Sequence, residues 1–162
     1  MTQTTTHGAH GAQPFPLLDE WQKLTRAGLA ASQACCAAHA LTWHARALQV
    51  AHQLLAGLED GVEDDDRIAA FVVSHLNIAD CYAEMDQPAR AAECLCCAHH
   101  KLMALLDGDA VPQSLQIIAS RQLRQTYAAM SEYRARHGAH PQIEQALRAC
   151  HAHIPAPGAW LH

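Results

Sequence analysis

The sequence has few lysines, no basic run and no long apolar segment. Lys23 and Lys101 are the only lysines, and nine scattered arginines complete the eleven basic residues of a chain whose formal net charge is −5. A protein that binds nucleic acid usually presents a basic stripe, so we predict no nucleic-acid partner. The longest apolar-rich segment, 41–58, is interrupted by two histidines and an arginine. Because a membrane-spanning helix needs about 18 consecutive apolar residues, we also predict no membrane span.

The first residues lack the two features of an export signal, a basic start and an apolar stretch. We interpret residues 1–16 as a disordered tail and predict a cytoplasmic location. Seven cysteines are an odd number, and they fall on expected helices. This arrangement is a poor disulfide framework, so we expect free thiols or metal ligands.

Common catalytic motifs are also missing. The sequence contains no glycine-rich phosphate loop, no H-E-x-x-H zinc motif and no nucleophile elbow. A cysteine nucleophile would need a base and an orienting group close in space, and a chain with seven cysteines and 13 histidines offers such pairs by chance. We therefore predict that the protein is not an enzyme.

Apolar residues at helical spacing and 33 alanines are abundant, whereas the alternation typical of strands is essentially absent. This pattern predicts an all-α fold in which residues 17–153 form one domain of about six helices, paired as three antiparallel hairpins, followed by an irregular tail, 154–162. The expected helices cover about 17–29, 40–58, 65–85, 88–106, 112–136 and 141–151. No glycine or proline lies between Leu29 and Ala56, so one long helix is the alternative to the first two.

Six acidic residues are concentrated in the eight residues 59–66. Gly61 can end one helix, and an aspartate within 64–66 can cap the next. A calcium loop requires alternating ligands around a central glycine and a later glutamate, and this order lacks that spacing. We interpret the segment as a solvated loop with a favourable helix cap.

One part of the chain resembles the tetratricopeptide repeat, a helix-turn-helix unit of 34 residues defined by small and large apolar positions. The best match runs from His75 to about Met103, and a weaker one begins near Leu24. The two matches are 51 residues apart. The third hairpin does not match the repeat and would serve as a cap. The matching positions are Ala79, Tyr82, the turn Asp86-Gln87-Pro88, Ala91, Leu95 and Ala98 in the first, and Gly28, Ala40 and Ala47 in the second. The turn of the second match would fall near Cys35-Cys36, without the usual glycine.

The resemblance implies a protein–protein interaction module that holds a peptide or a partner helix on a concave surface. The family's two-carboxylate clamp uses Lys and Asn where this chain has Leu76 and Asp80, so an apolar or basic partner is expected. A small bundle whose groove is filled by its own third hairpin, and a homo-oligomeric scaffold, are the alternatives. The residues implied to contact the partner are Val73, Leu76, Asp80, Ala83 and Glu84, with Gln22, Thr25, Leu29 and Ser32 on the weaker unit.

The segment Cys94-Leu-Cys-Cys-Ala-His-His100 suggests a second function. At helical spacing Cys96, His99 and His100 share one stripe, and His75 on the preceding helix could complete a zinc or copper site. A small metal-binding protein is therefore the alternative function. Cysteine also behaves as a small buried apolar residue, and closely packed helices need such residues. We favour packing over a metal cofactor.

Overall fold

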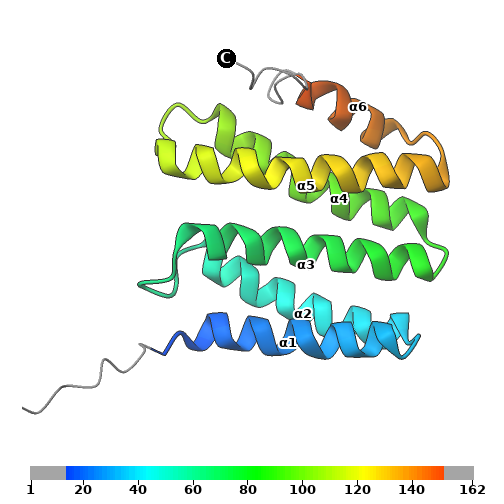
Figure 1. The fold of residues 1–162 in the computed structure, drawn as a ribbon, viewed down its shortest axis with the longest axis horizontal. Coiled ribbons are helices and arrows are strands. Elements are labelled where there is room, and N and C mark those ends of the chain that lie inside the picture. Colours follow the sequence, from blue (N-terminus) through cyan, green and yellow to red (C-terminus); the bar gives the residue numbers. More distant parts are fainter. Residues whose placement is uncertain (1–13, 152–162) are drawn as a thin grey trace, which may run out of the picture.

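The computed structural model describes residues 14–151; most of the predicted N-terminal tail and the C-terminal tail lie outside this range. The described part is all-helical, which confirms the predicted fold class (Figure 1). No helix within it combines the length and the apolar character that a membrane crossing requires. The six helices are α1 (Pro16–Gln33), α2 (Ala37–Leu55), α3 (Asp64–Glu84), α4 (Pro88–Asp107), α5 (Gln113–His137) and α6 (Pro141–Cys150).

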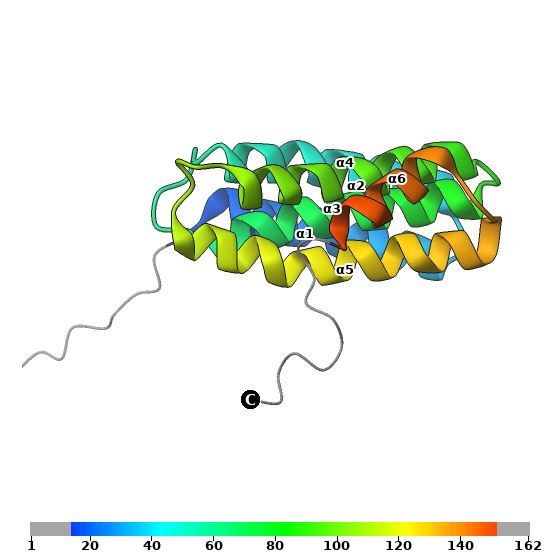
Figure 2. The same cartoon turned by 90° about the horizontal axis from the view of Figure 1, so that it is seen from above.

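The helices form two layers. Each helix packs against the next one in the chain, and contacts also join α1 to α3, α3 to α5 and α4 to α6. Figures 1 and 2 show α1, α3 and α5 in one layer and α2, α4 and α6 in the other. The third hairpin therefore extends the stack, with α5 lying beside α3.

A three-residue turn separates α1 from α2, so the alternative of one long helix is wrong. Cys35 has a φ of +59°, a left-handed conformation that costs a non-glycine residue about 1–2 kcal/mol. The backbone N–H of Cys36 donates to the carbonyl of Ala31, and that of Cys35 donates to Ser32. These bonds close the helix end in the way that a glycine usually allows. The weaker repeat match implies a turn near Cys35-Cys36, and the structure has it there, with a cysteine as the left-handed residue in place of the usual glycine.

The turn between α3 and α4 repeats the same geometry. Asp86 has a φ of +58°, and its N–H donates to Ala83 while the N–H of Gln87 donates to Tyr82. The two left-handed residues are 51 positions apart, and so are the starts of α2 and α4 at positions 37 and 88. The first two hairpins are thus equivalent at the offset found in the sequence. The third differs, because α6 begins 53 residues after α4, at position 141.

The same offset relates two pairs of facing core residues. Gly28 in α1 faces His44 in α2, and the equivalent residues of the next hairpin, Ala79 and Leu95, share one hydrophobic cluster. His44 is only 1% exposed, and a Cβ on residue 28 would clash with its ring. In the first hairpin, the absence of a side chain at Gly28 leaves room for the ring of His44. In the second hairpin, the small side chain of Ala79 lies at the position equivalent to Gly28, and Leu95 lies at that of His44.

The acidic segment between α2 and α3 corrects one expectation. Glu59 is buried, and its carboxylate accepts hydrogen bonds from the N–H groups of Leu17 and Leu18 at 2.8 and 3.0 Å. It therefore caps the start of α1, which is distant in sequence. Glu63 occupies the N-cap position of α3 without a side-chain hydrogen bond, so the predicted aspartate cap is wrong. The aspartates of 64–66 lie in the first turn, where their negative charges interact favourably with the helix dipole.

Candidate functional site

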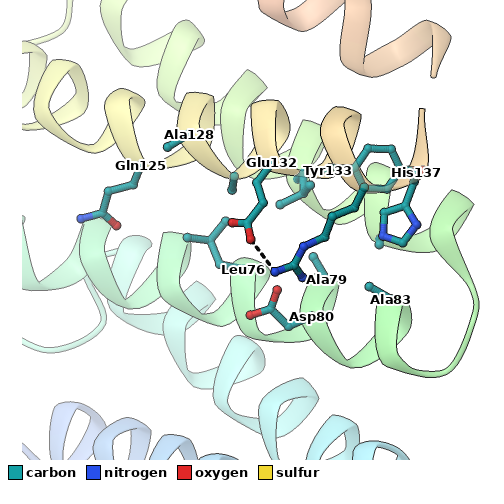
Figure 3. A pocket seen from close by; sticks show the side chains of 13 residues that line it. Leu76, Ala79, Asp80, Ala83, Gln125, Ala128, Glu132, Tyr133 and His137 are labelled. Carbon is teal, nitrogen blue, oxygen red and sulfur yellow. Dashed lines mark ion pairs between the residues drawn. The ribbon is translucent and has the colours of Figure 1, made fainter. Parts of the chain in front are cut away.

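A cavity of about 330 Å³ lies between α3 and α5, with α4 forming its base (Figure 3). An adjoining cavity of about 480 Å³ shares five of its lining residues and adds Glu84. We call the two together the α3–α5 groove. Besides Glu84, its lining residues are Leu76, Ala79, Asp80 and Ala83 of α3, Ala91 and Leu95 of α4, and Gln125, Ala128, Ala129, Glu132, Tyr133, Arg136 and His137 of α5.

Small side chains explain why this space is open. Five of the lining positions are alanines, contributed by all three helices, so the facing helices leave a hollow that larger side chains would fill. Leu76, Leu95 and Tyr133 add apolar surface. The Tyr133 ring is fixed because its hydroxyl donates to the carbonyl of Pro88 at 2.9 Å. The groove is therefore built on rigid helices, with an apolar floor.

One end of the groove is acidic. Asp80 on α3 and Glu132 on α5 extend into the same space in Figure 3, and Glu84 lies in the adjoining cavity. The dashed line in the figure marks the ion pair of Glu132 with Arg136, at 2.7 Å. Desolvation between the helices raises the pKa of Asp80, the negative charges of Glu132 and Glu84 raise it further, and Arg136 lowers it in part. Three carboxylates thus face a single guanidinium, which favours the binding of a further cation.

The structure places most of the predicted contact residues of α3 along the groove. Leu76, Asp80, Ala83 and Glu84 line it, whereas Val73 is half-buried outside it. No predicted residue of α1 lines the groove. There, Thr25 is buried, Gln22 and Leu29 are exposed, and Ser32 is half-buried.

Sequence reasoning missed the α5 wall of the groove. That wall includes Ala128, Glu132 and Arg136, all on the hairpin that matched no repeat template. The one available signal was the presence of two small residues, Ala128 and Ala129, on the same helix as Glu132 and Arg136. This signal alone does not say which neighbouring helix the residues face.

The structure does not bring the proposed metal ligands together. Cys96 and His99 are buried on α4, whereas the neighbouring His100 is exposed. His99 places its Nδ1 at 2.9 Å from the hydroxyl of Thr126, and burial raises the pKa of Cys96 to about 11. Within residues 14–151, no group of three or more Cys, His, Asp or Glu side chains is arranged to hold a metal. Cys96 belongs to a hydrophobic core cluster and His99 is fully buried, whereas His100 lies at the surface.

His75, the fourth proposed ligand, lies in an aromatic cluster on α3. Its ring centroid is 4.6 Å from that of Phe71 and 6.4 Å from that of His52. Neither ring nitrogen has a hydrogen-bond partner among the described residues. Burial, with a smaller effect from the positive form of His52, lowers the pKa of His75 to about 4. Burial likewise lowers the pKa of His99 to about 4, and the positive form of His100 lowers it by a smaller amount. Both buried rings are therefore neutral at pH 7.

Comparison with known proteins adds a family without a stated activity. A family model described as a protein of unknown function (DUF2753) matches residues 19–156. No curated protein and no solved structure matches the chain.

Proposed function

Because this chain belongs to the DUF2753 family, whose description names no function, we propose a function from the groove itself. The protein is a non-enzymatic interaction module that binds a peptide segment or a partner helix in the α3–α5 groove. The observation that carries this proposal is the groove's lining, which combines an apolar floor of alanines and leucines with a charged end. A few polar groups around an apolar hollow are typical of sites that bind with a defined orientation.

The lining also supports a binding role over a catalytic one. Among the described residues that form the groove there is no cysteine, serine or threonine that could act as a nucleophile. His137 is exposed and stacks near Tyr133, at 4.9 Å between ring centroids. None of these groups forms the hydrogen-bonded nucleophile and base pair that covalent catalysis needs.

The position of α5 argues against a groove filled by the described part of the third hairpin. α5 packs beside α3 and forms one wall of the groove, and a cavity remains between the two helices. Within residues 14–151, the groove is therefore open to an apolar side chain of a partner. Burying one leucine-sized side chain stabilises a complex by about 1.5–3 kcal/mol. Two such anchors supply about 3–6 kcal/mol, which corresponds to a Kd of about 40 μM or weaker even before the cost of association is subtracted.

The alternative function, a small zinc or copper protein, has less support. Its four proposed ligands, Cys96, His99, His100 and His75, differ in burial, and Cys96 and His99 are engaged in the core. We therefore retain the peptide-binding proposal.

A matched pair of tryptophan variants tests the proposal. Peptides selected from a random display library on the wild-type protein are expected to bind Ala128→Trp at least about tenfold more weakly, because the indole fills the groove. The same peptides should bind Ala45→Trp within about twofold, because exposed Ala45 lies on α2, in the other layer. Both residues are exposed, so both variants should fold. An equal loss of affinity in the two variants would contradict the proposal, and so would an unchanged affinity in Ala128→Trp.

A further inference from the structure

We infer that the segment bound in the α3–α5 groove is basic, and that one of its lysine or arginine side chains docks among Asp80, Glu84 and Glu132. This inference rests on the proposed function and specifies the chemistry of the partner. It follows from the charges at one end of the groove and from the apolar surface beside them.

The acidic end holds more negative charge than the protein itself neutralises. Among the described lining residues, Arg136 is the only arginine or lysine, and it pairs with Glu132 through a 2.7 Å contact. Within residues 14–151, neither Asp80 nor Glu84 has an ion pair with a basic side chain. Mutual repulsion contributes to the raised pKa of Asp80. A cation brought by the partner would relieve this repulsion, and an acidic segment would increase it.

The rest of the groove limits what flanks that cation. Leu76 and Ala79 of α3 and Ala128 and Ala129 of α5 line the part of the cavity that adjoins the carboxylates. In Figure 3, the labelled Leu76 and Ala128 lie on the side of Asp80 and Glu132 away from His137. A partner segment with an apolar residue beside a basic one therefore fits the lining. The apolar contact supplies most of the binding free energy, and the cation fixes the register.

A second copy of this chain does not supply such a segment from its described part. The formal net charge is −5, and the strongest concentration of basic residues in 14–151 is along α5, which itself builds the groove wall. Two molecules of one sign repel each other over distances of about 10 Å. The occupant that the charges favour is thus a basic segment of a different protein.

Arg136 has a specific place in this account. Its side chain is 70% exposed, and it neutralises part of the acidic end when the groove is empty. A bound lysine or arginine would compete with it for Glu132. Removing the Arg136 side chain should therefore strengthen the binding of a basic segment, whereas removing carboxylates should weaken it.

Peptides from a random display library test the inference. Sequences selected on the wild-type protein should carry a lysine or arginine next to an apolar residue. At low salt they should bind Asp80→Asn/Glu84→Gln about tenfold more weakly and Arg136→Ala about threefold more tightly, and both differences should shrink at high salt. All three substituted side chains are exposed, so these variants should fold.

The outcomes separate this inference from the function on which it rests. Selected peptides that lose affinity for Ala128→Trp but are neutral or acidic, or that ignore the carboxylate variants, would overturn the basic-segment inference and keep the groove function. A failure to enrich any peptide, or peptides indifferent to Ala128→Trp, would overturn both. Basic peptides that respond to all the variants in the stated directions would support both.

Discussion

Lowering the pH from 7 to about 4.5 is expected to reduce the free energy of unfolding by about 5 kcal/mol. His75 and His99 are buried, and burial holds the pKa of each at about 4 in the folded protein against 6.5 in the unfolded chain. The unfolded state therefore binds protons first as the pH falls. The contribution of the two neutral rings to the free energy of unfolding is fully present above about pH 6.5, and it is lost as the pH falls toward 4. Each ring contributes about 2–3 kcal/mol to this loss.

A histidine variant isolates this effect from the titration of carboxylates. His75→Leu replaces a ring without hydrogen-bond partners by an apolar side chain of similar size, and it should remove the contribution of this ring, about 2–3 kcal/mol. His99 and buried His44, whose pKa burial also lowers, keep their contributions. His39→Leu, at an exposed position on α2, is the surface control for the histidine-to-leucine change. Urea unfolding at the two pH values provides the measurement. An unchanged pH dependence in His75→Leu would mean that the buried ring does not stay neutral in the folded protein.

Replacing Arg67 with alanine is expected to destabilise the protein by about 3 kcal/mol. The Arg67 guanidinium donates to the backbone carbonyls of Leu54 and Val62 at 2.8 and 3.0 Å and to that of Glu59 at 2.6 Å. It thus holds the connection between α2 and α3 in one conformation. Through that connection it also positions the Glu59 carboxylate that caps α1. Its loss would leave several carbonyls without a donor and loosen the α1 cap.

A second arginine provides the control for this prediction. Arg121 pairs with Asp65 at 3.7 Å, but both side chains are more than half exposed, so Arg121→Ala should change the stability by less than about 0.5 kcal/mol. Arg67→Lys keeps the charge but cannot reach three carbonyls at once, and we expect it to recover only part of the loss. Denaturant unfolding of the three variants compares them. A cost below about 1 kcal/mol for Arg67→Ala would contradict this role.

The sequence predicted the fold wherever the breaks had ordinary turn chemistry. Asp86-Gln87-Pro88 was recognised as a turn, and its proline begins α4 as expected. The turn at Cys35 contains no glycine or proline, so only the weaker repeat match indicates it. The role of Glu59 was also hidden, because a carboxylate that caps a helix about 40 residues away leaves no local pattern.

The candidate site was predictable on one helix only. Residues of α3 fell on the template of a known repeat, and four of the five lie along the groove. The α5 wall could not be predicted, because its residues face α3 only through tertiary packing. Likewise, a stripe of Cys96, His99 and His100 on one helix does not reveal which of them point into the core. In the structure the first two are buried and the third is exposed.

Amide hydrogen exchange with a display-selected peptide tests the central claim most directly. Because the peptide is expected to lie between α3 and α5, its binding should slow exchange in segments 76–84 and 125–137. Exchange in α2, in the other layer, should not change. Protection confined to these two segments is the result that a peptide-binding groove predicts. Protection on the α2 and α4 face, with segments 76–84 and 125–137 unchanged, would contradict it.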